Sequence, residues 1–369
     1  MCCSASRSFF SHVLSSIISA IQPHLRNLTY VDNTISKRDQ LSKIATRTGL
    51  VRLLEFCPRP NTVLAFNYHR VGNHEATTYH DLFSADENMF AAQVEIIKRK
   101  TSVLCLNEVL ELLLRGKPFK GTVTLVTFDD GYLDNYRTAF PILRSAGVPG
   151  LFFLATSFVG SSQPPWWDEI AFIVRHCKFD VLNLDYPAPQ SLPLGAGRRD
   201  TAIRELINLY QRCPDGPRLL ADLRDRSEVQ FDLKRAERLF LDWNEAREMI
   251  AGGMDIGAHT HSHCNLGRLS LDDQIDELRT CREQLEGRLN RCIDVLADPY
   301  GNPDSFNRDT FVALERLGYR AAFSYYGGIN RPGAVNKYNL ARCGIDHAET
   351  LARFRLRLAT SPLLNGYWF

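Results

Sequence analysis

The chain has 369 residues, of which 44% are hydrophobic and 23% are charged, and its formal net charge is +2. This composition is typical of a globular protein with one large core or two modest ones. The small net charge gives no electrostatic argument for a nucleic acid or an anionic membrane as a partner.

The first 60 residues are predicted to form a helical extension with basic patches. Within it, Phe9 to Ile21 is apolar on average but is interrupted by serines. This stretch follows a single basic residue, Arg7, precedes no A-x-A site and is too short to span a bilayer. We therefore expect an amphipathic helix and no transmembrane segment. The ten cysteines contain no C-x-x-C pair, which favours a reducing compartment, and a cytoplasmic location is expected. Membrane association or export, through the apolar N-terminal stretch, is the alternative.

Strands and helices are predicted to alternate over most of residues 61–369. The strand predictions rest on apolar, β-branched runs and the helix predictions on apolar spacing between capping and breaking residues. Strands are predicted at 62–68, 103–105, 123–128, 151–155, 254–258, 293–297 and 321–325. Helices are predicted at 90–100, 107–114, 133–146, 243–251, 270–289 and 307–317, with Asn107 as a cap.

Residues 161 to about 240 break this alternation. They open with two prolines and the run Trp166-Trp167-Asp168, and they include a charged helical stretch from Asp200 to Arg212. We interpret them as an insertion carried by the main domain. The remaining alternation favours an α/β fold in which crossover helices join parallel strands.

Polar residues follow four of the predicted strands directly. They are His69, the pair Asp129-Asp130, His259 and Tyr300. In a parallel α/β barrel the carboxyl ends of the strands converge on one face, where active sites lie. The sequence therefore predicts one site built from four separate segments.

The spacing of His259 and His263, with three residues between them, is common for two ligands of one metal ion. Asp130 would add a carboxylate oxygen, and Asp129 could accept a proton. Two imidazoles and one carboxylate leave coordination positions open for water and substrate, as a catalytic metal requires. Structural roles are the alternative for each residue: a polar turn for the aspartates, and core or solvent-facing positions for the histidines.

Two motifs carry a family resemblance. Thr127–Tyr132 and His259–His263 resemble the first two motifs of the polysaccharide deacetylases, the NodB-homology or family 4 carbohydrate esterases. Asp298–Gly301 resembles their third motif, and Phe152–Leu154 the strand after the first. The resemblance covers roughly residues 62 to 345 without the insertion. It implies a distorted (β/α) barrel and metal-dependent removal of acetyl groups from N-acetylhexosamine units of a glycan.

The resemblance also implies roles. It implies that Asp129 is the catalytic base and that Asp130, His259 and His263 are metal ligands. It also implies that the backbone amide of Tyr300 helps to hold the oxyanion. Zinc is the expected metal for this ligand set, and cobalt or nickel can substitute.

Two departures from the family pattern stand out. The arginine that usually orients the base is replaced by Ala297, and Arg342 is a candidate replacement. The late motif that carries the acid is missing, but Tyr68-His69-Arg70-Val71 matches the early motif of the subgroup that deacetylates poly-N-acetylglucosamine. His69 is therefore the expected general acid, with His347 as the competing candidate.

Trp166, Trp167 and Asp168 are expected either to line the substrate cleft, because sugars pack on aromatic faces, or to anchor the insertion. Two other functions remain open. Ala297 motivates a carbohydrate-binding relic without turnover, and two histidines with a carboxylate also make the triad of iron oxygenases. The glycan, the N- or O-linkage of its acetyl groups and the oligomeric state are left undecided.

Overall fold

A computed structural model describes residues 37–56, 61–74, 77, 79–117, 119–229, 238–325 and 327–362. Its centre is an eight-stranded sheet that runs in the order β11-β10-β9-β6-β5-β1-β12, with β4 also paired to β5. Every pairing in this sheet is parallel. The strands are β1 (Thr62–Tyr68), β4 (Ser102–Val103), β5 (Thr122–Phe128), β6 (Gly150–Leu154), β9 (Asp255–Ala258), β10 (Val295–Ala297), β11 (Ala321–Phe323) and β12 (Cys343–Gly344).

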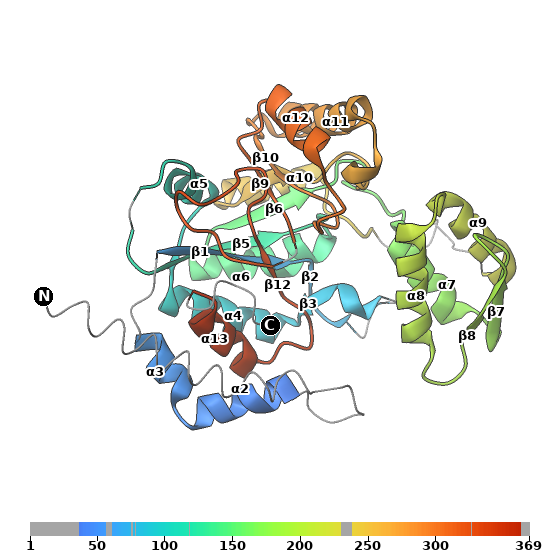
Figure 1. Cartoon of the computed structure of the whole chain (residues 1–369), viewed down its shortest axis with the longest axis horizontal. Coiled ribbons are helices and arrows are strands. Elements are labelled where there is room, and N and C mark those ends of the chain that lie inside the picture. The colour runs from blue at the N-terminus through green and yellow to red at the C-terminus, as the bar shows by residue number, and fades with distance from the viewer. Residues whose placement is uncertain are drawn as a thin grey trace, which may run out of the picture.

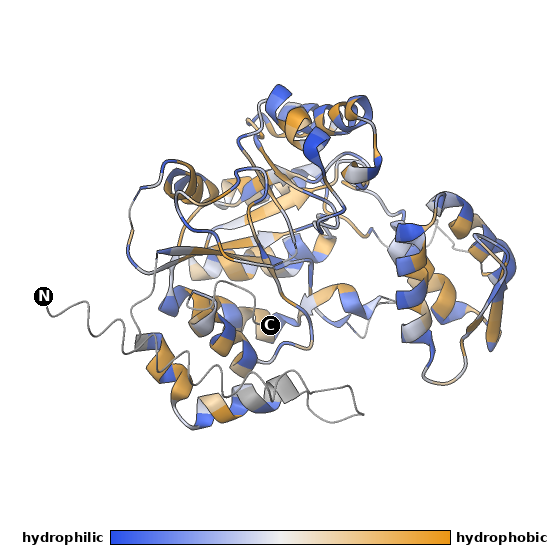
Figure 2. Ribbon diagram, in the orientation of Figure 1, coloured by the Kyte–Doolittle hydropathy of each residue, from blue (hydrophilic) through white to orange (hydrophobic). Residues whose placement is uncertain are grey.

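The sheet curls into a half-barrel, and helices surround it (Figure 1). All seven residues of β1 and of β5 are buried, because both faces of a parallel sheet are covered. In β1, Leu64 and Phe66 enter the larger core cluster beneath the outer helices, whereas Val63 and Ala65 enter the cluster on the other face. Apolar residues are accordingly concentrated on the sheet and on the helix sides that face it (Figure 2).

The helices of the main body mostly lie where the sequence predicts them. They are α4 (Glu87–Lys100), α5 (Leu106–Leu114), α6 (Phe140–Ala146), α10 (Trp243–Ala251), α11 (Leu271–Leu289), α12 (Arg308–Arg316) and α13 (Leu351–Thr360). The cap predicted at Asn107 is wrong, because α5 begins one residue earlier and Cys105 is its N-cap. The helix predicted from Leu133 opens as a π-helix at Asn135–Ala139 before α6. Strand β12 and helix α13 were not predicted.

The insertion contains more regular structure than the sequence indicated. It comprises α7 (Trp166–His176), β7 (Val181–Leu184), β8 (Gln190–Pro193), α8 (Arg199–Arg212) and α9 (Gly216–Ser227). These elements share an apolar cluster of their own, which includes Ile170, Leu206 and Leu219. Figure 1 shows them beside the half-barrel as a separate lobe.

Two helices of the N-terminal region pack against α13. They are α2 (Lys37–Arg47) and α3 (Leu50–Phe56), and Val51 and Leu54 share a small cluster with Leu356. Glu55 binds Lys100 and Arg355, which ties α3 to α4 and α13. The apolar stretch Phe9–Ile21 lies outside the described residues. In the described part of the chain, no helix combines the length and the apolar character that crossing a bilayer requires.

Candidate active site

The turn after β5 places two adjacent carboxylates at the carboxyl edge of the sheet. Asp130 has φ 72° and Gly131 has φ 77°, so the strand ends in a left-handed turn. A Cβ on Gly131 would lie 2.7 Å from Cδ2 of Leu154, and glycine is therefore required there for space as well as for conformation. The turn buries both Asp129 and Asp130, each 3% exposed.

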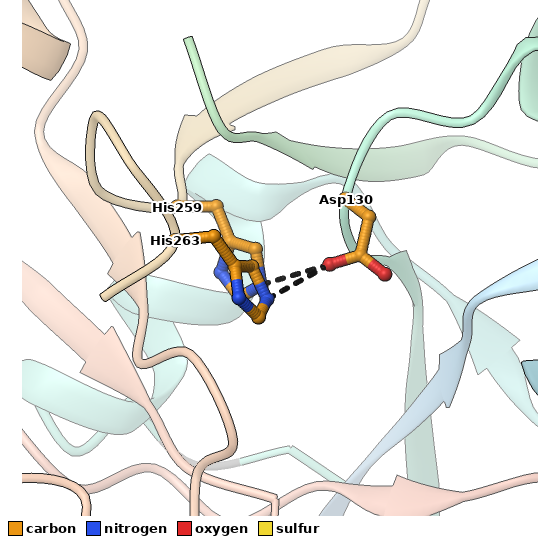
Figure 3. Close-up of side chains that lie close together, drawn as sticks. All are labelled: Asp130, His259 and His263. Carbon is orange, nitrogen blue, oxygen red and sulfur yellow. Dashed lines mark ion pairs between the residues drawn. The ribbon is translucent and has the colours of Figure 1, made fainter. Parts of the chain in front are cut away.

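Asp130, His259 and His263 bring one ligand atom each to a common point (Figure 3). Oδ1 of Asp130 lies 3.3 Å from Nε2 of His259 and 3.1 Å from Nε2 of His263. When metal–ligand bonds are about 2.1 Å long, the ligand atoms of a tetrahedral ion are roughly 3.4 Å apart. The three atoms therefore fit the coordination of a divalent metal. All three side chains are buried, and Oδ1 of Asp130 makes no hydrogen bond with the described residues.

The segment between the two histidines is a turn and not a strand. Thr260 has φ 60° and His263 has φ 57°, conformations that non-glycine residues rarely adopt. Glu277 of α11 holds the turn, since its Oε2 accepts from the backbone N–H groups of His261 and Ser262 at 3.0 and 2.9 Å. His261 does not line the pocket, and its Nδ1 lies 2.9 Å from Oγ1 of Thr156.

The Nδ1 atom of His259 lies 2.8 Å from the backbone carbonyl oxygen of Ala297. A hydrogen bond there leaves Nε2 unprotonated and directed at Asp130, which is the tautomer that a metal ligand needs. Ala297 thus supports the site through its backbone, although it lacks the arginine side chain of the family pattern.

Arg342 binds Asp129 through two hydrogen bonds. Its Nη1 and Nη2 donate to Oδ1 and Oδ2 of Asp129 at 2.7 and 2.9 Å, and the arginine is fully buried. Asn67 of β1 completes the contact, because its Nδ2 donates to Oδ2 of Asp129 at 2.9 Å. Sequence reasoning missed Asn67, although a lone amide in an otherwise apolar strand was a usable indication.

The charges around the carboxylates fix their ionisation. Burial opposes the charged form of Asp129, but the Arg342 guanidinium, with His259 and His69, holds its pKa below the usual range. Burial likewise opposes ionisation of Asp130, and the adjacent imidazoles of His259 and His263 keep its pKa well below the usual value. Both groups are therefore carboxylates at neutral pH, as a base and a metal ligand must be.

His69 lines the same pocket as the metal-ligand residues. Its backbone N–H donates to Ser84 and its carbonyl accepts from Asn135, while its ring stands edge-on to Tyr325 at 5.3 Å between centroids. The other candidate acid, His347, stacks on His74 and does not line the pocket.

Tyr300 also lines the pocket, and its ring lies 5.3 Å from that of His263. It has φ 64° and Gly301 has φ 60°. A Cβ on Gly301 would lie 2.5 Å from the backbone nitrogen of Tyr325, so this sharp turn depends on glycine.

The three residues at the start of α7 take different positions. Trp166 lines the pocket and is partly exposed. Trp167 also lines the pocket but is buried. It donates from Nε1 to the hydroxyl of Tyr132 at 2.8 Å, and that hydroxyl donates to Oδ2 of Asp168 at 2.7 Å. Asp168 is not at the pocket wall, so the substrate contact expected of it is not supported. Its burial raises its pKa to about 6, against the lowering effect of Arg70 and Tyr132.

The pocket has a volume of about 260 Å³, close to the lower end of small-molecule sites at about 300 Å³. Asp298, the first residue of the third motif, is a wall residue to which the sequence assigned no role. It is 1% exposed, and neither carboxylate oxygen has a hydrogen-bond partner among the described residues. Burial raises its pKa to about 8, against the lowering effect of Arg342 and His259.

The model of the polysaccharide deacetylase family matches residues 116–322, more than half of the chain. The chain belongs to this family. It is 31% identical over 118 residues to a poly-beta-1,6-N-acetyl-D-glucosamine N-deacetylase of Staphylococcus epidermidis, and 19% identical over 226 residues to a putative polysaccharide deacetylase of Bacillus subtilis. These matches cover 28% and 61% of the chain, but only 39% and 51% of the relatives.

Solved structures share the fold. The IcaB protein of Ammonifex degensii has a TM-score of 0.54 and 18% identity, with 82% of this chain and 98% of that one covered. The Streptococcus pyogenes deacetylase PplD, solved with acetate, has a TM-score of 0.53 and 19% identity, with 80% and 99% covered. These similarities confirm the deacetylase-type (β/α) half-barrel that the sequence predicted.

Proposed function

We propose that the protein removes acetyl groups from N-acetylhexosamine units of a glycan, with a divalent metal, zinc by default, at Asp130, His259 and His263. The observation that carries the proposal is the juxtaposition of two differently held carboxylates in one pocket. Asp130 lies against two imidazoles, whereas Asp129 is hydrogen-bonded to Arg342 and is available to act as the base. The activity named for the Staphylococcus epidermidis relative supports poly-β-1,6-N-acetylglucosamine as the first substrate to test.

The chain's own residues would share the proton transfers. A divalent metal in this site supplies Lewis acidity and lowers the pKa of a bound water to about 7. Asp129 would accept a proton from the attacking water, with Arg342 fixing the direction of the carboxylate. The backbone amide of Tyr300 would stabilise the developing oxyanion.

His69 would protonate the departing amine. An amine is a poor leaving group unless it gains a proton as the bond breaks, and an imidazole is a common general acid for such a transfer. Its place in the pocket supports His69 over His347. Arg342 on Asp129 also removes the argument for a relic that rested on Ala297. We further propose a cytoplasmic location, supported by seven free cysteines among the described residues.

The first experiment measures bound metal and acetate release from poly-β-1,6-N-acetylglucosamine, chitooligosaccharides and acetylated xylan. Asp129→Asn should retain the metal but lower turnover by about 10²–10⁴-fold, the usual contribution of a general base. Asp130→Asn should lower metal affinity first. The hydrolase proposal fails if the protein binds no divalent metal, or if no glycan yields acetate. Oxygen consumption without acetate release would identify an oxygenase instead.

His69→Ala tests the acid. It should lower turnover of the amide by about 10²–10⁴-fold and spare nitrophenyl acetate, whose leaving group needs no proton. Metal content should stay unchanged. His347→Ala is the matched control, and a larger amide defect in that variant would assign the acid to His347.

A further inference from the structure

Packing, and not hydrogen bonding, holds the imidazole of His69 among the described residues. The backbone is fixed on both sides, because its N–H donates to Ser84 and its carbonyl accepts from Asn135. Neither ring nitrogen has a hydrogen-bond partner in the described part of the chain. A histidine that serves as general acid must nevertheless direct its proton at the leaving group. The direction of this ring therefore depends on the side chain that packs against it, which is Tyr325.

Tyr325 follows β11 and lies at the carboxyl edge of the sheet. Its ring is perpendicular to that of His69, with 5.3 Å between centroids and 89° between planes. Aromatic pairs prefer this edge-to-face arrangement. Both residues line the pocket that contains Asp129. Tyr325 therefore limits the rotation of an imidazole that faces the reacting centre.

Two glycines make room for Tyr325. A Cβ on Gly301 would lie 2.4 Å from Cβ of Tyr325, and a Cβ on Gly344 would lie 2.3 Å from its hydroxyl oxygen. Gly344 is the last residue of β12 and its φ is not positive, so glycine is needed there for space alone. A glycine weakens a strand, and in a strand it often marks a close approach. The tyrosine is thus confined at its backbone by the turn at Gly301 and at its hydroxyl by β12.

The chemistry of Tyr325 argues against a direct part in proton transfer. Burial raises the pKa of its phenol to about 12, and the carboxylate of Asp129 acts in the same direction. A general acid is most effective when its pKa is close to the working pH, so this phenol is a weak donor near neutrality. Its hydroxyl oxygen also lies against Gly344. The ring, and not the hydroxyl, is therefore the part of Tyr325 that acts on His69.

We propose that Tyr325 is a positioning residue for His69, and that Gly344 sets the place of Tyr325. The phenol ring holds the imidazole in the orientation that protonates the departing amine. The inference rests on the proposed deacetylase function and deepens it. Arg342, which directly precedes β12, holds Asp129, so one short segment of the chain then fixes both the base and the acid.

The kinetic test compares poly-β-1,6-N-acetylglucosamine with nitrophenyl acetate, whose leaving group needs no proton. Tyr325→Ala should lower kcat on the glycan by about 10–100-fold, the cost of a misplaced catalytic group, with little change in KM or metal content. It should spare nitrophenyl acetate. Tyr325→Phe keeps the ring and should retain most of the rate. When His69→Ala is already present, Tyr325→Ala should cost nothing further, because the group that it positions is gone.

Gly344→Ala tests the same contact from the other side. The new Cβ should displace the ring of Tyr325 and lower the rate on the glycan selectively, as Tyr325→Ala does. Because Tyr325→Ala removes the obstacle, the double variant should be no slower than Tyr325→Ala alone, and additive losses would overturn the role of Gly344. Gly287→Ala is the matched control, since a Cβ there has open space. If Tyr325→Ala fails to fold by circular dichroism, Gly344→Ala and Tyr325→Phe decide the outcome.

A measurement without turnover separates this inference from the deacetylase function. In protein with isotope-labelled histidine, the ring resonance that is absent from His69→Ala belongs to His69, and the ring current of Tyr325 acts on it. Tyr325→Ala and Gly344→Ala should each shift this resonance, whereas Gly287→Ala should not. An unmoved resonance, or an equal loss of rate on amide and ester, would overturn the positioning role. A shifted resonance in a protein that releases acetate from no glycan would preserve the contact and refute the deacetylase function instead.

Discussion

Asp129 and Asp130 are neighbours in the chain, but their partners differ in kind. Asp129 receives three hydrogen bonds from Arg342 and Asn67, whereas Asp130 faces two imidazoles. The left-handed conformation of Asp130 sends the two side chains to different partners within one buried site. The roles proposed for the two carboxylates therefore depend on individual residues, and variants at single positions can test them.

Arg342→Gln should slow turnover by about 10–100-fold, part of the full contribution of a general base, while leaving metal content unchanged. The arginine lowers the pKa of Asp129, so its loss raises that pKa and moves the acid limb of the kcat/KM profile to higher pH. Arg342→Lys should recover part of the rate. Removing one partner of a buried ion pair costs about 3–5 kcal/mol, so folding is checked by circular dichroism. An acid limb that does not move would leave Arg342 with a structural role only.

Asp298→Asn should stabilise the chelator-treated protein increasingly as pH rises. The folded pKa of Asp298, about 8, lies above the usual value of 3.8. The contribution of Asp298 to the parent's stability is therefore fully present below about pH 4 and is lost as pH rises to 8. The asparagine variant lacks this loss. The difference in the free energy of unfolding between the variant and the parent should grow by at most about 1.4 kcal/mol per pH unit and should level off above pH 8. Denaturant unfolding between pH 4 and 9 measures this difference, and a difference that stays constant with pH would contradict the prediction.

At the scale of elements, the candidate metal site depends on a turn that α11 holds in place. Two of the positive φ values in the site belong to Thr260 and His263, and Glu277 accepts the backbone N–H groups between them. A strained turn persists only where the surrounding structure determines it. The position of His263 is consequently set by a helix that contributes no ligand itself.

Glu277→Ala should lower metal affinity by about 10–100-fold, as the loss of supporting contacts around ligands usually does. The fold should survive, because Glu277 is not part of the apolar core. Competition with a chromogenic chelator gives the dissociation constant. Glu283→Ala, an exposed acidic residue on the same helix, is the control. Equal affinity in both variants would show that the turn holds its conformation without Glu277.

At the scale of the molecule, the insertion and the main body have separate apolar cores. The insertion packs around residues such as Leu223, and the main body around residues such as Leu285, both fully buried. Regions with separate cores can open separately, with free energies of their own.

Leu223→Ala should cost about 2–5 kcal/mol, the usual range for a buried leucine. The loss should fall on the insertion, so hydrogen exchange should rise in α7, α8 and α9 while β1 and β5 stay protected. Leu285→Ala should accelerate exchange in the main body instead. If both variants raised exchange everywhere by the same factor, the two cores would form one cooperative unit.

The sequence by itself determined the alternation of strands and helices and the three residues of the candidate metal site. Both are local properties: apolar runs between capping and breaking residues define the elements, and Asp-Asp-Gly and the two spaced histidines carry their chemistry within a few residues. Because parallel strands bring their carboxyl ends to one edge, the sequence could also predict that His69, Asp129 and His259 share a face.

Only the tertiary structure decided the contacts between distant segments. Arg342 reaches Asp129 because β12 pairs with β1, and a two-residue strand leaves no periodic pattern in a sequence. Likewise, α8 reaches the pocket because the insertion folds around its own core, and no local pattern indicates which side of a lobe will face a distant site. Such contacts depend on how the whole chain packs. That the carboxyl of Asp298 has no hydrogen-bond partner among the described residues becomes visible only once its neighbours are in place.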